Sequence, residues 1–156
     1  MKNKRIGSIG ILVLLSVLFA LSSCDRMKVG YLNTTNASYN PDTVFAFRNI
    51  DPKSERAKNN APWTSVRIQG VAGTVPINYE YVSVKTAKGG DAQRFNEQVK
   101  KGNVLIQGGI IQLFQAGVKE IPNGTYTLTI RVYNEDHSAL LKDIFTFVVS
   151  DNAPTN

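Results

Sequence analysis

The side chains with the widest chemical use are scarce in this chain of 156 residues, which has one cysteine, one histidine and one tryptophan. The cysteine, Cys24, follows Ser22 and Ser23 at the end of an apolar run that begins at Ile9. A cationic start, a short apolar segment and small residues before a cut site are the marks of a secretory signal. The pattern therefore predicts that the chain is exported and cleaved directly before its only thiol.

The tetrad Leu21-Ser22-Ser23-Cys24 resembles the lipobox of bacterial lipoproteins. The resemblance implies that the Cys24 sulfur is diacylglycerylated, that residues 1–23 are removed and that the new amino terminus is acylated. Several acyl chains hold a protein firmly, because each buried methylene contributes about 0.8 kcal/mol, whereas one chain binds reversibly. The alternative is an ordinary signal peptide followed by a chance cysteine. The absence of any second cysteine in the sequence favours lipidation, because an unpaired thiol is a liability in an oxidising compartment.

The charge of the mature chain is small. The full sequence has 18 Lys and Arg against 12 Asp and Glu, which gives +6. Three of the basic residues, Lys2, Lys4 and Arg5, lie in the predicted signal, so the remaining 133 residues carry 15 basic and 12 acidic side chains, or +3. So small an excess does not predict a nucleic-acid partner. A chain of this length predicts one folded domain.

Composition divides the mature chain into three parts. Residues 24–42 are rich in Asn, Thr and Ser and predict a polar spacer, with a short strand near Val29 to Leu32. From 43 to 151, short runs of β-branched and aromatic residues alternate with Gly, Pro and Asn clusters. This spacing predicts an all-β sandwich of seven to eight strands. Residues 152–156 are predicted to form a tail.

Several local patterns in the sequence predict details of the sandwich. The run from Tyr126 to Tyr133 alternates strictly, with Tyr126, Leu128, Ile130 and Val132 facing inward. The apolar side chains change phase after Tyr81, which predicts a bulge. Phe95 and Val99 are four residues apart and predict a helical turn before Gly102. Tyr126 follows a turn and predicts a structural contact similar to a tyrosine corner.

Residues 77–154 resemble the latter part of a cadherin repeat. The resemblance rests on an ordered set of short matches and implies an immunoglobulin-like Greek-key β-sandwich of seven strands. The matching residues are Gly89-Gly90-Asp91, Phe95, Gly102-Asn103-Val104-Leu105-Ile106, Tyr126 to Val132, Asp136, Leu140 and Asp151-Asn152-Ala153-Pro154.

The cadherin resemblance raises the question of a calcium site. Calcium needs six to eight oxygens that converge on one point. Where the cadherin pattern has a carboxylate at the end of the penultimate strand, this chain has the amide of Asn134. The remaining acids are too few for a tight site, so no metal is predicted. A weaker alternative is a calcium site formed by Glu135, Asp136 and Asp151.

Catalysis is not predicted either. A Ser/His/Asp arrangement would need His137, the only histidine, and no Gly-x-Ser-x-Gly elbow is present. Zinc would need several His or Cys ligands. No cofactor is expected.

The function that the sequence predicts is a non-catalytic binding or adhesion module, with a glycan as its expected ligand. Aromatic rings stack on sugar rings, while amides and carboxylates bind their hydroxyls. Trp63, at a junction of loop and strand, is the first candidate, followed by Tyr133 at an outward position and Tyr39 in the spacer. For Trp63 a second role, as a core anchor of the sandwich, stays open.

The layout of lipobox, spacer and small sandwich also resembles accessory lipoproteins of outer-membrane glycan-uptake systems in Gram-negative bacteria. The resemblance implies a membrane anchor at Cys24, an outer-membrane location and a glycan ligand, and leaves the periplasmic or exterior face open. The rival prediction is a structural or assembly lipoprotein that contacts another envelope protein, by strand addition at an exposed sheet edge.

Overall fold

The computed structural model describes residues 29–153, so the predicted signal, Cys24 and the end of the predicted tail lie outside the described residues. The described chain is mainly β-structure, with three short helices. The elements in chain order are β1 (Leu32–Asn33), β2 (Thr43–Phe47), α2 (Glu55–Lys58), β3 (Trp63–Thr64), β4 (Ala72–Gly73), β5 (Asn78–Ala87), α3 (Ala92–Lys100), β6 (Val104–Gln107), β7 (Ile110–Leu113), α4 (Gln115–Glu120), β8 (Gly124–Tyr133) and β9 (Ser138–Ser150).

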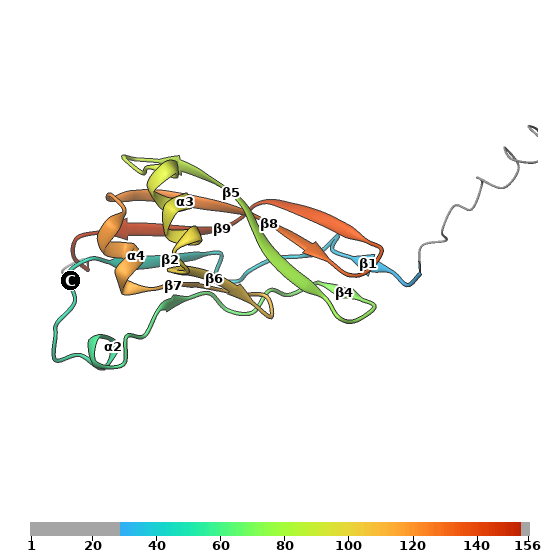
Figure 1. Ribbon diagram of the computed structural model, residues 1–156, viewed down its shortest axis with the longest axis horizontal. Coiled ribbons are helices and arrows are strands. Elements are labelled where there is room, and N and C mark those ends of the chain that lie inside the picture. Colours follow the sequence, from blue (N-terminus) through green and yellow to red (C-terminus); the bar gives the residue numbers. More distant parts are fainter. Residues whose placement is uncertain (1–28, 154–156) are drawn as a thin grey trace, which may run out of the picture.

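The strands form one four-stranded sheet, one three-stranded sheet and a small strand pair (Figure 1). The four-stranded sheet has the order β2-β9-β8-β5, the three-stranded sheet has the order β3-β7-β6, and β1 pairs with β4. The larger two sheets enclose one apolar core. The predicted all-β class, as a sandwich of sheets, is therefore confirmed.

The predicted alternation of β8 is present, and its inward-facing side chains form the centre of the core. The inward residues Tyr126, Leu128, Ile130 and Val132 are fully buried. Phe145 and Phe147 of the neighbouring β9 pack edge to face, with ring centroids 5.1 Å apart. Strand pairing and side-chain alternation thus agree along the centre of the large sheet.

The predicted bulge and helix are also present. The pairing of β5 with β8 shifts register between Tyr81 and Ser83, where the apolar phase changes in the sequence. The helix α3 begins after Asp91, whose side chain caps it by accepting a hydrogen bond from the Arg94 amide at 3.0 Å. Phe95 of α3 is fully buried and stacks on Tyr126 at 5.1 Å between ring centroids.

A parallel strand pair joins the two ends of the domain. The strand β2 runs parallel to the last part of β9, with Thr43 opposite Thr146 and Phe47 opposite Ser150. The other pairings in the sheets are antiparallel. The sequence pattern predicted β2 as a strand and did not predict its partner.

The predicted spacer is wrong for residues 29–42, because they belong to the folded body. The strand β1 lies in this stretch, and Ser38 forms a bridge with Gln69. Two glycines permit the close approach: a Cβ on Gly30, at φ +81°, would lie 2.3 Å from Thr74 Oγ1, and one on Gly70 would lie 2.0 Å from a backbone oxygen. Most residues of this stretch stay exposed, so its sequence is polar although its backbone is bonded to the body.

Among residues 29–153, no helix combines the length and the apolar character needed to cross a bilayer.

Candidate functional site

Tyr39, which the sequence placed in the spacer as a ligand-binding ring, lies in the core with 4% of its surface exposed. Its hydroxyl donates a hydrogen bond to the Gly109 carbonyl oxygen at 3.1 Å. Its ring meets Phe145 edge-on, with centroids 5.1 Å apart. Burial raises the pKa of the Tyr39 hydroxyl above its usual value. The expectation that Tyr39 presents a ring to a ligand is therefore wrong.

Trp63, the first candidate for stacking on a sugar, is also 4% exposed. It begins β3 and pairs with Leu113 of β7. The Arg56 guanidinium lies 4.8 Å from the centroid of the indole and also donates to the Pro62 carbonyl oxygen at 2.7 Å. Of the two roles left open by the sequence, the structure supports the core anchor. The prediction of a Trp63 binding platform is wrong.

Tyr133 is the predicted aromatic that keeps an accessible side chain. It ends β8 and is half-buried. The Arg131 guanidinium lies 4.5 Å from the centroid of the Tyr133 ring, and its Nη2 donates to Glu80 Oε2 at 2.9 Å. A neighbouring hollow of about 290 Å³ is lined by Tyr133 and the turn between β8 and β9. One face of this ring is thus already covered by a cation.

The acids of the calcium alternative lie at opposite ends of one strand. Glu135 and Asp136 precede β9 and Asp151 follows it, and the 13 extended residues between them span about 40 Å. Asp151 forms an ion pair with Arg48. Within residues 29–153, no group of three or more His, Cys, Asp or Glu side chains is arranged to hold a metal ion. A calcium site shared by these three acids is therefore excluded.

A polar hollow of about 500 Å³ lies at the other end of the molecule, beside α3 and α4. Four of its lining side chains are amides, which come from four different segments of the chain. We call this site the amide hollow, after Asn60, Gln98, Asn103 and Gln115.

Two of these amides are buried and held in place. Gln98 is 1% exposed, and its Oε1 accepts a hydrogen bond from Asn103 Nδ2 at 2.8 Å. Gln115 is 8% exposed, and its Nε2 donates to the Arg48 carbonyl oxygen at 2.8 Å. The Gln115 Oε1 has no hydrogen-bond partner among the described residues. A buried polar atom without a partner costs about 1–3 kcal/mol, so this acceptor is expected to gain when a hydroxyl or a water reaches it.

The backbone around the hollow explains why these amides meet. The Asn103 amide donates to the Gln98 carbonyl oxygen at 2.9 Å, which turns the chain from α3 into β6. The Phe114 amide donates to the Asn103 carbonyl oxygen at 2.9 Å, just before α4. Gly117 lets α4 approach closely, because a Cβ there would lie 3.0 Å from the Cβ of Asn103. The end of α3, the start of β6 and α4 are thereby fixed around one concavity.

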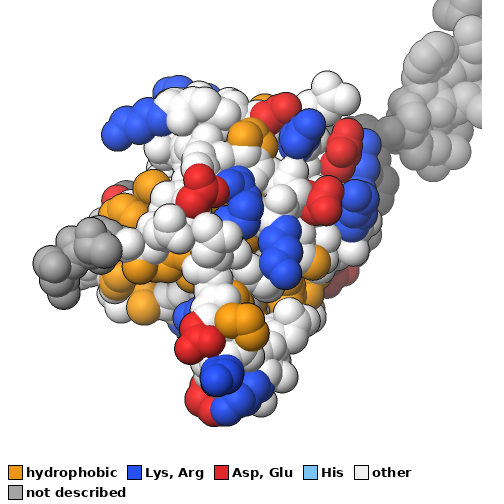
Figure 2. Space-filling model, turned by 90° about the vertical axis from the view of Figure 1, so that its left-hand side faces the viewer, with side chains coloured by type: hydrophobic (Ala, Val, Ile, Leu, Met, Phe, Trp, Pro, Cys, Tyr) orange, Lys and Arg blue, Asp and Glu red, His pale blue; other side chains and the backbone are white. Residues whose placement is uncertain are grey.

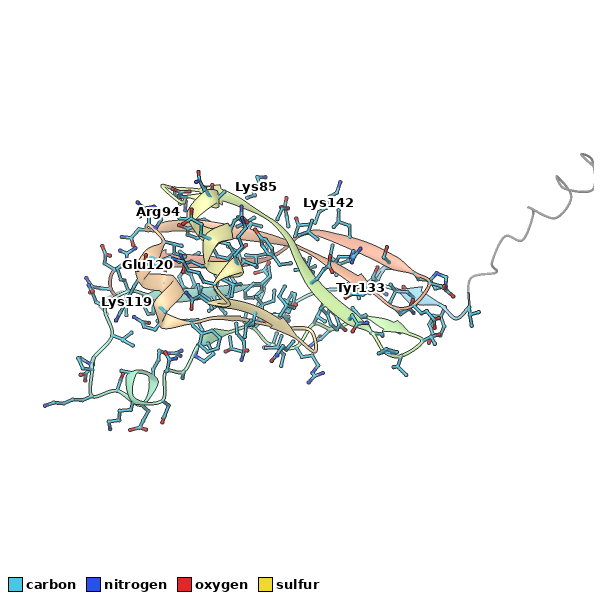
Figure 3. All side chains as sticks on the ribbon, viewed as in Figure 1. Lys85, Arg94, Lys119, Glu120, Tyr133 and Lys142 are labelled. Carbon is cyan, nitrogen blue, oxygen red and sulfur yellow. The ribbon has the colours of Figure 1, made fainter. Side chains whose placement is uncertain are left out.

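Charged groups surround the amides. Lys101, Lys119 and Glu120 also line the hollow, and Figure 3 shows Lys119 and Glu120 on α4, toward the opposite end of the molecule from Tyr133. Figure 2 looks onto this end and shows side chains of both charge signs spread over it, with a hydrophobic area to one side. The two lysines exceed the one carboxylate, so the rim of the hollow is weakly cationic.

The chemistry available in the hollow is hydrogen bonding. Amides offer two donors and two acceptor lone pairs each and do not titrate near neutral pH. These amides are scattered over 56 positions and carry no motif, so the sequence does not predict the site. The spacing of Phe114 and Val118, four residues apart, was a signal for α4, whose first turn closes with the Val118 amide donating to the Phe114 carbonyl oxygen at 3.1 Å.

No family model, no curated protein and no solved structure matches this chain. The residues themselves are therefore the basis for function, and the amide hollow is the site that they favour.

Proposed function

We propose that this protein is a lipid-anchored, non-catalytic binding module of the bacterial cell envelope, and that it holds a glycan in the amide hollow. The observation that carries the proposal is the set of four amides, two of them buried, on one concave surface. Sugars present hydroxyls that both donate and accept, and amides match both functions. Side chains already ordered by packing lose little conformational entropy when a ligand binds.

Binding without chemistry fits the lining of the hollow. Glu120 is the single carboxylate among the residues that line it, whereas hydrolysis of a glycosidic bond ordinarily uses two. His137, the only histidine of the chain, contacts the Gly30 carbonyl oxygen at 3.0 Å, far from the hollow. Both observations favour a receptor over an enzyme.

We assign the sandwich to the immunoglobulin-like Greek-key folds, in line with the cadherin resemblance. The strand orders β2-β9-β8-β5 and β3-β7-β6 support this assignment, since the chain passes repeatedly between two sheets, with the hairpin β6-β7 in one sheet and the hairpin β8-β9 in the other. A further support is Tyr126, whose hydroxyl donates to the Pro122 carbonyl oxygen four residues upstream at 2.7 Å. This contact matches the tyrosine corner expected from the sequence.

The proposed anchor is an acylated Cys24, placed in the outer membrane. The end of the described chain that starts at Val29 lies beside β1 and β4, and α2 and α4 lie at the other end (Figure 1). An anchor on that side would leave the amide hollow pointing away from the membrane. Such an arrangement suits a receptor whose ligand arrives from the space outside the bilayer.

The test is affinity electrophoresis of the full acylated chain in mild detergent, through gels that contain a panel of neutral and acidic polysaccharides. Asn60→Ala and Lys119→Ala remove two exposed members of the lining, and Lys142→Ala is the matched control on an exposed position of β9. Retardation by one polysaccharide that both lining variants weaken, and that the control leaves unchanged, supports the proposal. Equal retardation of all variants, or none with a folded protein, refutes binding in the amide hollow.

The rival role, strand addition to another envelope protein, has less support. The sheet edge at β5 is ten residues long, which would suffice for a partner strand. Its register shift at Tyr81/Ser83 interrupts the edge, and Lys85 pairs with Asp143 at 3.9 Å beside it. Bulges and charged side chains are the usual protection of an edge strand against pairing.

A further inference from the structure

Three exposed apolar side chains gather at the end of the molecule opposite the amide hollow. Val29, Tyr31 and Val75 are 69%, 57% and 80% exposed, although large apolar side chains are usually covered. They come from two segments that lie side by side, since the Tyr31 amide donates to Thr74 Oγ1 at 3.1 Å and the Thr74 amide donates to the Tyr31 carbonyl oxygen at 2.9 Å. We call Val29, Tyr31 and Val75 the anchor-side patch.

The turn between β8 and β9 holds this patch rigidly. Asn134 is buried, and its Nδ2 donates to the carbonyl oxygens of Tyr31 at 2.9 Å and Thr74 at 3.1 Å. The Val29 amide donates to Asp136 Oδ2 at 2.7 Å. The backbone at Val29, Tyr31 and Thr74 is therefore fixed to the body by hydrogen bonds.

The distance to the proposed acylated residue is short. Val29 is five positions after Cys24, and five fully extended residues span at most about 18 Å. The acyl chains lie in the bilayer, and the headgroup layer outside the hydrocarbon is about 5 to 8 Å thick. The linking sequence Asp25-Arg26-Met27-Lys28 has two basic residues and one acidic residue, and its net charge of +1 weakly favours an anionic lipid surface.

We propose that the anchor-side patch of Val29, Tyr31 and Val75 rests in the headgroup region of the bilayer and holds the sandwich upright on the membrane. This inference rests on the proposed lipid attachment at Cys24. Tyrosine suits the site, because its ring prefers the boundary between hydrocarbon and headgroups. The two valines add apolar area on either side of it. The bilayer is the occupant that the length of the linking chain selects.

The test uses the full chain with its signal, produced in a Gram-negative host and reconstituted into vesicles of phosphatidylethanolamine and phosphatidylglycerol. Cys24 is the only native cysteine, so Val75→Cys offers a nitroxide label one new thiol once Cys24 is acylated. Val66→Cys is the matched control, since Val66 is an exposed valine outside the patch. Mass spectrometry of the amino-terminal peptide reports acylation, and power saturation reports the access of oxygen and of a water-soluble nickel complex to each label.

In vesicles, the ratio of oxygen access to nickel access should be several-fold higher for the label at position 75 than for the label at position 66. In a chain that lacks the signal and Cys24 and is kept in detergent-free solution, the two labels should give equal ratios. An acylated chain that floats with the vesicles, but whose label at 75 is as open to nickel as the label at 66, overturns the docking alone. A chain that carries no acyl group and does not float overturns the anchor and the docking together.

Discussion

The Tyr126 hydroxyl donates a hydrogen bond of 2.7 Å to the carbonyl oxygen of Pro122, four residues earlier in the chain. The same hydroxyl oxygen accepts from the Asp91 amide at 3.3 Å. One buried phenol thus fastens the loop before β8 and the loop before α3 to the core. Phe95, from the helix that Asp91 caps, stacks on the same ring.

Replacement of Tyr126 by phenylalanine should destabilise the fold by about 1–3 kcal/mol, because it leaves the Pro122 carbonyl and the Asp91 amide without their partner. Urea unfolding followed by circular dichroism measures the loss. The control is Tyr133→Phe, whose hydroxyl makes no comparable core contact and which should stay within about 0.5 kcal/mol of the wild type. Equal stability of the two variants would contradict a structural role for the Tyr126 hydroxyl.

Replacement of Asn134 by alanine should release the segment that begins at Val29. The variant loses two hydrogen bonds to carbonyl oxygens and one from the His137 amide to Asn134 Oδ1, at 2.9 Å. Hydrogen exchange of residues 29–38 should speed up strongly, while exchange in β8 stays slow. The control variant is Ser138→Ala, an exposed neighbour. Unchanged exchange in the 29–38 segment would mean that Asn134 does not hold it.

Replacement of Trp63 should affect stability rather than ligand binding. Trp63→Ala should cost about 3–5 kcal/mol, as expected for a large buried aromatic side chain. Trp63→Phe keeps most of the apolar volume, so it should remain folded and bind a polysaccharide as the wild type does. If a folded Trp63→Phe protein lost glycan binding while the Asn60→Ala variant still bound the glycan, the binding site would lie at Trp63 and not in the amide hollow.

Alkaline pH should destabilise the protein through buried tyrosines. Burial raises the pKa of Tyr81 to about 12 from its usual 10.0 and also raises the pKa of Tyr39. The folded state therefore keeps these phenols protonated where the unfolded state releases the proton. Their contribution is complete below about pH 10 and falls as the pH rises toward 12.

The measurement is the urea midpoint across this pH range for the wild type and for the Tyr39→Phe/Tyr81→Phe double variant. The double variant should lose stability less steeply with rising pH, while Tyr31→Phe, an exposed tyrosine, should follow the wild type. Parallel curves for the wild type and the double variant would show that the two phenols do not set the alkaline limit.

Local patterns in the sequence predicted the parts of the fold that depend on neighbouring residues. Alternation along β8, the phase change after Tyr81 and the helical turn at Phe95 are all decided within about ten residues. The contact of Tyr39 with Gly109 joins residues 70 positions apart, and a polar stretch around Tyr39 gave no sign of it. The parallel partner of β2 was hidden for the same reason.

The site shows the same limit. Trp63 looked like a loop residue because its flanking residues are polar, yet the sheet partner Leu113 draws it into the core. Conversely, no pattern in the sequence marked Gln98 and Gln115 as buried, and their burial follows from the packing of α3 and α4. Residue type predicts only the average burial of a side chain, whereas the burial of these three residues depends on tertiary contacts.

The parallel pairing of β2 with β9 gives the domain a direction of mechanical strength. Thr43 lies opposite Thr146 and Phe47 lies opposite Ser150, so tension applied at the start of β2 and at the end of β9 pulls the two strands along each other. In that geometry the bonds between the strands are loaded together instead of opening one after another. A domain held on one side and pulled by its carboxyl end would therefore yield only at a high force, and would release the contacts of residues 29–38 before it lost its sheet.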